Sequence, residues 1–211
     1  MPLYPDILNE NCADISDWTD GDTSTGVSEI DPAGQFRFDT NAVANSYVKA
    51  ERHRTIVSPP NQFTIEVETY FDAIGSYGDE DCAMLDYFTN TWGFRVVFAS
   101  DGLFILKNAG YTEVGTNIVK CNASAALQTW RFQVDKSTGE ENATVEVFLE
   151  DISQGTFDCD NRAAYSADGQ ICLTQYGTTT TDRVSHIESL KVATGLDKIY
   201  GPATSDFFKL L

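Results

Sequence analysis

Two stretches of alternating apolar and polar residues stand out between positions 128 and 151. Trp130, Phe132 and Val134 alternate with polar residues in the first stretch, 128–135, and every second residue from Val145 to Leu149 is apolar in the next. Alternation with a period of two predicts β-strands that bury one face. Residues 136–142 between them are polar apart from one glycine, so we expect an antiparallel hairpin. A second layer must cover its apolar face.

Similar short strand patterns recur along the rest of the chain, separated by turn residues such as Asp101 and Gly102. A loop is expected over 153–169, and no helical periodicity extends over ten residues. Many short strands with almost no helix predict an all-β fold, a two-sheet antiparallel jelly-roll sandwich. The remaining predicted strands are 34–39, 46–51, 54–58, 63–71, 82–89, 92–100, 103–107, 170–176 and 184–193, the last with imperfect alternation.

The length of 211 residues suits one sandwich, so we expect a single domain over 1–211. The segment 195–211 ends in Phe207, Phe208, Leu210 and Leu211. It is expected to be either a final packed strand or an arm that docks on a neighbouring subunit.

The charge excludes several classes of partner. A formal net charge of −18 and a pI near 4.2 argue against nucleic acid and anionic membranes, which need clustered Lys and Arg. No apolar run is long enough to span a bilayer, so no membrane insertion is expected. The N-terminal residues lack the basic and apolar regions of a signal peptide. We therefore expect synthesis in the cytoplasm and, by another route, an extracellular or virion-surface location.

Five cysteines match no zinc-binding spacing: Cys12, Cys82, Cys121, Cys159 and Cys172. Buried reduced thiols are the favoured interpretation. In an oxidising compartment, Cys159 and Cys172 could instead form a disulfide.

Four segments together resemble the concanavalin A-like lectin/glucanase superfamily, including its laminin-G-like and pentraxin-like jelly rolls. They are NCADISDWTDGD from Asn11, FTIEVETYFDA from Phe63, WGFRVVFASDGLFILK from Trp92, and the hairpin of residues 130–151. The resemblance covers roughly Ile7 to Thr194 and implies a concanavalin A-like sandwich. Because the superfamily contains lectins, hydrolases, lyases and structural domains, the resemblance does not imply one function.

Catalytic motifs of this superfamily are missing. Hydrolases of this fold carry E-x-D-x-E or E-x-D-x-x-E on one strand, and neither string occurs. Glu66 and Glu68 come nearest, on the polar face of the strand over 63–71, where a solvated face is the simpler interpretation. The Gln-x-His and Tyr-x-Lys-x-Tyr patterns of alginate-lyase-like jelly rolls are also absent, and His53 and His186 are the only histidines.

Carbohydrate binding is easier to accommodate than catalysis. Aromatic faces stack on sugar rings while polar side chains bind hydroxyl groups. The candidate binding residues are Trp92, Tyr87, Arg95, Tyr70 and Glu68. Trp92 is the first choice, although it shares the apolar parity of Phe94 and could belong to the core.

Two acidic loops could hold a structural calcium ion, because short Asp-rich loops supply oxygen ligands. The candidate ligands are Asp20 and Asp22 in the first loop and Asp79 and Asp81 in the second. Ordinary acidic loops are the alternative.

These observations favour a non-catalytic, lectin-like domain that binds a glycan or mediates surface adhesion, with a phage virion component as one setting. The alternatives are a structural virion protein that binds other copies or neighbouring subunits, and a divergent polysaccharide hydrolase or lyase that uses Glu66 or Glu68.

Overall fold

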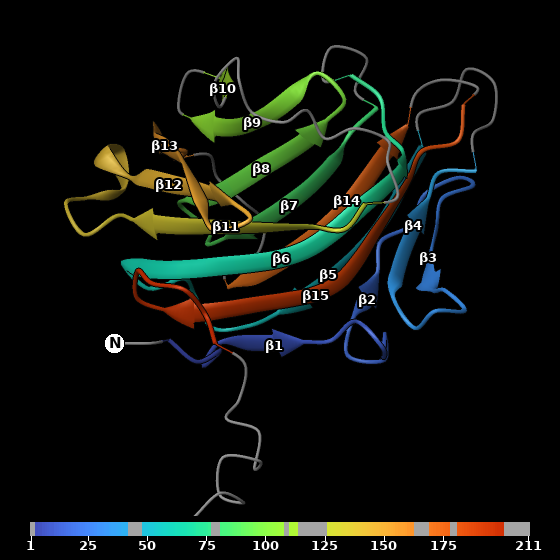
Figure 1. The fold of residues 1–211 in the computed structure, drawn as a ribbon, viewed down its shortest axis with the longest axis horizontal. Coiled ribbons are helices and arrows are strands. Elements are labelled where there is room, and N and C mark those ends of the chain that lie inside the picture. The colour runs from blue at the N-terminus through green and yellow to red at the C-terminus, as the bar shows by residue number, and fades with distance from the viewer. Residues whose placement is uncertain are drawn as a thin grey trace, which may run out of the picture.

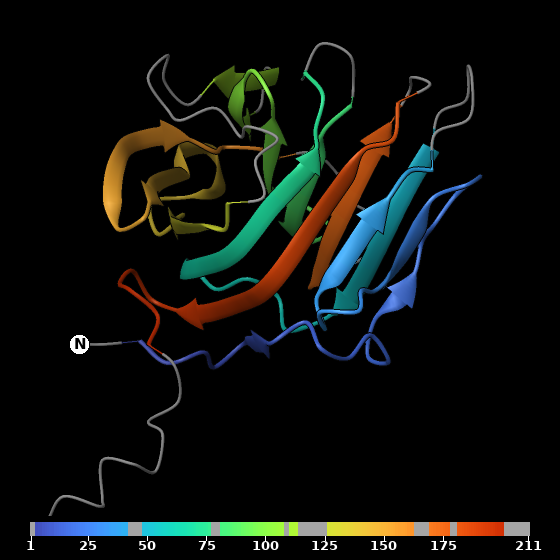
Figure 2. The same ribbon diagram turned by 45° about the vertical axis from the view of Figure 1, so that its right-hand side comes forward.

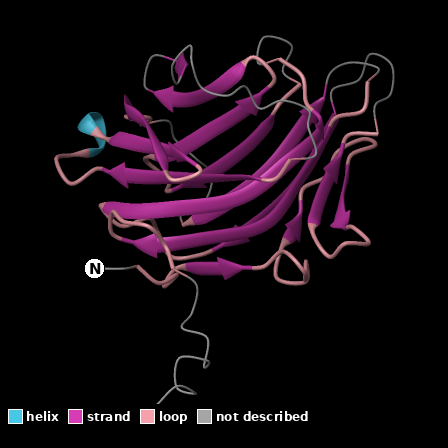
Figure 3. Cartoon of the chain, in the orientation of Figure 1, coloured by secondary structure: helices cyan, strands magenta, loops and turns pink. Residues whose placement is uncertain are grey.

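The computed structural model describes residues 3–41, 48–76, 81–107, 110–113, 126–162, 169–177 and 181–200. Their strands pair antiparallel in two sheets that lie face to face (Figures 1 and 3). The front sheet has the order β13 (Ile152–Asp158), β12 (Thr144–Leu149), β11 (Gln128–Asp135), β6 (Gln62–Ala73), β15 (Val184–Thr194), β4 (Phe36–Asp39) and β3 (Val27–Ile30). The back sheet has the order β10 (Gly110–Glu113), β9 (Gly102–Lys107), β8 (Gly93–Ala99), β7 (Ala83–Phe88), β14 (Gln170–Gly177), β5 (Val48–Thr55) and β2 (Thr19–Asp20). This confirms the predicted all-β, two-sheet antiparallel jelly roll.

The predicted hairpin is formed by β11 and β12. Trp130 faces Leu149 and Phe132 faces Val147 across the pair, so the apolar residues of both strands share one face. The loop between them contains a short 3-10 turn over Glu140–Asn142. On its other edge β11 pairs with β6, whose other neighbour is β15; Figure 2 shows β6 and β15 side by side along the front sheet.

The core lies between the two sheets and is rich in aromatic rings. Phe132 of β11 lies 5.6 Å from Phe94 of β8, measured between ring centroids. Trp130 lies 5.8 Å from Phe98 of the same back-sheet strand. Both front-sheet side chains are fully buried. Rings from the two layers therefore interdigitate as in other sandwiches.

Two strand predictions need correction, and the short strands over 8–10, 19–20, 27–30 and 110–113 were not predicted. The predicted strands 46–51 and 54–58 are joined over residues 48–55 in one strand, β5, because Arg52 and Arg54 lie on its core-facing parity and have polar partners there. Arg52 Nη2 donates to the Ser28 carbonyl at 2.7 Å, and Arg54 Nη1 lies 3.2 Å from Glu10. β13 falls in the predicted loop because this edge strand buries little surface and shows no alternation. The imperfect alternation in β15 reflects a register shift between Ile187 and Ser189.

After β15 the chain turns back toward the N-terminal segment. The peptide N–H of Tyr200 donates to the Leu3 carbonyl at 2.8 Å, and β1 (Leu8–Glu10) pairs with the second half of β15. Of the segment 195–211, predicted to be a final strand or an arm, residues 195–200 form this return with a single bridge between Ile199 and Leu3, and residues 201–211 lie outside the described residues. No helix in the described ranges is long and apolar enough to cross a membrane.

Cys12, Cys82, Cys159 and Cys172 are buried and form no disulfide with one another, so the predicted alternative of a bond between Cys159 and Cys172 is not formed. Cys121 lies outside the described residues.

We expect Phe132→Ala to lower the free energy of unfolding by about 3–5 kcal/mol, because it leaves a cavity among the rings of both sheets. Urea unfolding measures the loss. Ile152→Ala, at a residue that is 67% exposed, is the control and should change stability by less than about 0.5 kcal/mol. Similar losses in both variants would contradict this account of the core.

Candidate functional site

The structure divides the five predicted sugar-binding residues among three locations. Trp92 and Tyr87 are fully buried, which corrects their assignment to a binding surface. Trp92 packs edge-on against Phe63 with Lys136 Nζ 5.1 Å from its ring, and the Tyr87 hydroxyl donates to the Val57 carbonyl at 2.8 Å. Neither ring offers a face for stacking on a sugar.

Tyr70 and Glu68 lie on the outer face of the front sheet and already have partners. The Tyr70 ring stacks on His186 at 4.3 Å between centroids, and its hydroxyl donates to Gln35 Oε1 at 3.0 Å. Glu68 Oε2 accepts a hydrogen bond from Ser189 Oγ at 2.6 Å.

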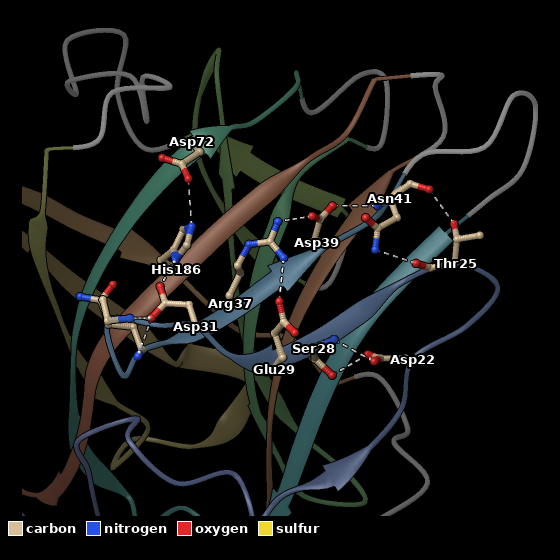
Figure 4. A network of polar contacts seen from close by, with 12 residues as sticks. Asp22, Thr25, Ser28, Glu29, Asp31, Arg37, Asp39, Asn41, Asp72 and His186 are labelled. Atoms are coloured by element: carbon tan, nitrogen blue, oxygen red, sulfur yellow. Dashed lines mark hydrogen bonds and ion pairs between the residues drawn. The ribbon is translucent and has the colours of Figure 1, made fainter.

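His186 is the centre of a polar cluster on the same face (Figure 4). Its Nδ1 lies 3.1 Å from Asp31 Oδ2, and its Nε2 lies 3.0 Å from Asp72 Oδ2. Only 4% of His186 is exposed. Because the cluster joins β6, β15 and the turn between β3 and β4, we interpret it as structural.

The predicted calcium ligands that the structure describes have other partners. Asp22 accepts hydrogen bonds from the Ser28 peptide N–H on Oδ2 and the Glu51 peptide N–H on Oδ1. Asp20 pairs with Arg52 at 3.3 Å, and fully buried Asp81 pairs with Arg183 at 2.8 Å. Asp79 lies outside the described residues. Within the described ranges, no three His, Cys, Asp or Glu residues are placed to hold a metal ion.

Arg95, the fifth predicted residue, lies on the outer face of the back sheet. There the side chains of four adjacent strands form a cross-strand row. Arg95 of β8 lies opposite Asp86 of β7, and Asp86 lies opposite Cys172 of β14. Cys172 in turn lies opposite His53 of β5. Residues directly opposite each other on one face of a sheet have neighbouring side chains, so charged and polar groups follow one line across β8, β7, β14 and β5.

The ion pair between Asp86 and Arg95 fixes one end of this row. Arg95 Nε and Nη2 donate to the two carboxylate oxygens of Asp86, each at 2.6 Å. Burial raises the pKa of Asp86 above its ordinary value, although the guanidinium of Arg95 opposes this shift. A quarter of the Arg95 side chain is exposed. The pair therefore holds a guanidinium in a fixed orientation at the surface.

A second line of side chains runs beside this row and is amphipathic. Phe104, Val97 and Met84 are cross-strand neighbours at its apolar end. At its polar end Thr174 Oγ1 donates to Glu51 Oε2 at 3.2 Å, and Lys49 Nζ lies 2.9 Å from the same carboxylate. Tyr176, which follows Thr174 on the same face of β14, is partly exposed. We call both lines the back-sheet surface: Lys49, Glu51, His53, Met84, Asp86, Arg95, Val97, Phe104, Cys172, Thr174 and Tyr176. Asp86, Val97, Cys172 and Thr174 are themselves buried, so the side chains that a ligand can reach are the partly exposed ones.

The back-sheet surface is suited to binding rather than to thiol chemistry. Burial raises the pKa of the Cys172 thiol, which keeps it protonated and poorly nucleophilic. Arg95 pairs with Asp86 and Lys49 pairs with Glu51, so the positive and negative charges cancel within each pair. Partly exposed Met84 and Phe104 supply apolar contact.

Sequence reasoning missed most of this surface. It named His53 only as one of the two histidines, and it gave no role to Glu51 or Thr174. The signal available was parity, because Cys172, Thr174 and Tyr176 oppose the core residues Ile171 and Leu173. Which strands stand beside β14 could not be inferred from that alternation.

The comparison with solved structures identifies the fold. An endo-β-1,4-glucuronan lyase from the fungus Trichoderma reesei superposes with a TM-score of 0.62 at 8% identity, covering 87% of this chain and 94% of that one. The carbohydrate recognition domain of Emp46p, as a mutant, gives 0.60 at 13% identity over 89% and 96%. The chain has the concanavalin A-like jelly-roll fold.

Other proteins that share this concanavalin A-like fold include a mutant of the alginate lyase Aly36B in complex with an alginate tetrasaccharide. It has a TM-score of 0.54 at 11% identity, over 93% of this chain and 99% of that one. No protein-family model and no curated protein matches the sequence. At these identities the likeness shows the fold alone.

We expect Arg95→Met to destabilise the protein by about 3–5 kcal/mol at neutral pH, because it leaves the buried Asp86 carboxylate unpaired. The folded state already raises the pKa of Asp86, so it binds that proton more tightly than the unfolded state does. The loss should therefore shrink at acidic pH, where Asp86 is protonated, and grow as pH rises through its folded pKa. Urea unfolding across that range measures it.

The control for this experiment is the double variant Asp86→Asn with Arg95→Met, which has no buried carboxylate at this position. Its stability should vary less with pH than that of Arg95→Met. A loss in Arg95→Met that stays constant between acidic and neutral pH would contradict the proposed cause.

The buried thiols give a separate expectation. Burial raises the pKa values of Cys12, Cys159 and Cys172. In a Cys121→Ser variant, which retains only the four described cysteines, a thiol-specific dye should therefore react slowly in the native state and fully after denaturation. Rapid labelling of the native variant would contradict the burial.

Proposed function

We propose that this chain is a carbohydrate-binding domain whose glycan site is the back-sheet surface. The amphipathic cross-strand arrangement carries the proposal. A sugar presents apolar C–H faces beside hydroxyl groups, and the back-sheet surface carries partly exposed Met84 and Phe104 on the same face as the partly exposed polar side chains of Glu51 and His53.

The fixed ion pair adds to this argument. The guanidinium of Arg95 is oriented by Asp86 before any ligand arrives, so it loses little conformational freedom on binding. Two solved structures with this fold lend support, since one is a glucuronan lyase and the other is a carbohydrate recognition domain.

The test is a glycan array with the purified chain, followed by titration of any glycan that binds. We expect His53→Ala and Tyr176→Ala each to weaken binding by about three- to tenfold, as loss of one polar contact or one stacking ring would do. Gln133→Ala, on the outer face of the front sheet, is the control and should bind like the parent chain.

Two outcomes would overturn the proposal. The first is an array with no bound glycan, which would remove carbohydrate binding altogether. The second is a glycan whose binding survives both back-sheet variants, which would place the site elsewhere. Repeating the array with calcium and with EDTA tests the cation expected from the sequence; a carbohydrate recognition domain of the same fold is described as potassium-bound.

Adhesion at a surface, a role in a virus particle and self-association stay predictions from the sequence. Hydrolase or lyase activity through Glu66 or Glu68 also remains a prediction from the sequence. Incubating the bound glycan with the chain and assaying for new reducing ends or unsaturated products distinguishes an enzyme from a binding domain.

A further inference from the structure

A hollow of about 390 Å³ opens on the outer face of the front sheet, on the opposite side of the sandwich from the back-sheet surface. Pockets that bind small molecules generally measure about 300–1,000 Å³. We call it the front hollow, and define it by its charged lining residues Glu66, Glu68, Glu150, Asp151, Lys191 and Lys198.

Distant parts of the chain build the front hollow. Glu66 and Glu68 of β6 and Lys191 of β15 lie side by side at its base, since Lys191 is the register partner of Glu66. Asp151, in the turn between β12 and β13, forms ion pairs with both Lys198 and Arg131. These contacts tie the returning segment 195–200 to the sheet, so the hollow has defined walls.

Glu66 is the unusual residue of the front hollow. It is 5% exposed, and its Oε2 has no hydrogen-bond partner within the described part of the chain. Its other oxygen, Oε1, lies 3.7 Å from Lys191 Nζ, a distance that is long for a hydrogen bond. Burial raises the pKa of Glu66, whereas Lys191, Arg131 and Lys198 act in the opposite direction. A buried carboxylate oxygen without a donor is costly, which points to a donor that binds there.

The other carboxylates of the front hollow are better satisfied. Glu68 accepts from Ser189 Oγ, and Glu150 Oε1 accepts from the Thr129 peptide N–H at 2.7 Å. Tyr200, 48% exposed, adds an aromatic ring to the lining. Glu66 therefore offers the strongest unmet acceptor, next to a ring on which a ligand can stack.

The charge of the front hollow selects the ligand. Four carboxylates and two ammonium groups line it, within a chain of net charge −18. Like charges repel at short range in a partly buried site, so an anionic sugar such as a uronate is disfavoured. A protonated amine matches both the excess of carboxylates and the missing donor at Glu66.

We propose that the front hollow binds an amino sugar, with the ammonium group of the ligand donating to Glu66 and the sugar ring packing on Tyr200. This site is independent of the back-sheet surface and would hold if the glycan proposal for that surface failed.

The test is an NMR titration of the whole chain, isotope-labelled on its backbone, with glucosamine, glucose, N-acetylglucosamine and glucuronate in weakly acidic buffer. We expect glucosamine to bind about tenfold more tightly than the other three, which is the factor that one charge-assisted hydrogen bond supplies. The shifted amides should lie in β6, β11 and β15.

Glu66→Gln keeps the size of the side chain and removes its charge, so it should abolish the preference for glucosamine. The matched control is Glu146→Gln, which removes one carboxylate from the outer face of β12, outside the front hollow. It should retain the preference, as should His53→Ala on the back sheet. Amide spectra of each variant without ligand establish that it is folded.

Three results would overturn the inference. They are the absence of glucosamine binding, equal affinity for glucose and glucosamine, and an undiminished preference in folded Glu66→Gln. Water alone as the partner of Glu66 would produce the first result, and a general affinity for sugars would produce the second.

Discussion

The face-to-face packing of two sheets on one layer of apolar side chains is the constraint on which the rest of the structure depends. β6 shows its effect, because it pairs on both edges and directs Phe63, Ile65 and Val67 into the core. Successive strand residues point to opposite faces. Once these side chains are buried, Glu66 and Glu68 must face outward. The core therefore also decides which polar groups the protein displays.

The same rule explains why the aromatic candidates for sugar binding were misplaced. Tyr87 has the parity of Leu85, and Trp92 that of Phe94, so alternation alone assigns both rings to the core. Residue type suggested a binding role, but burying a large ring yields more free energy than exposing it. Alternation is the better guide wherever a strand is long enough to show it.

Alternation predicted the sandwich, its central hairpin and most of its longer strands, but it could not predict the polar surfaces. The row from Arg95 to His53 exists because β14 lies between β7 and β5, and such long-range pairing leaves no mark in the alternation of any one strand. β13 escaped detection for a related reason, since an edge strand with few buried residues has no alternation to detect. Likewise, Lys198 and Tyr200 line the front hollow with Glu66 because the segment 195–200 returns to the sheet, which no alternation in β6 indicates.

The two outer faces differ in how their charges are satisfied, and this difference bears on what each can bind. On the back sheet, Asp86 and Glu51 already have cationic partners, so a ligand there meets fixed, balanced dipoles and gains mainly from shape and apolar contact. On the front sheet, Glu66 keeps a buried oxygen without a donor among the described residues. A ligand that supplies this donor relieves a cost already present in the free protein. Selectivity for charge is therefore expected from the front face, and tolerance of varied neutral sugars from the back.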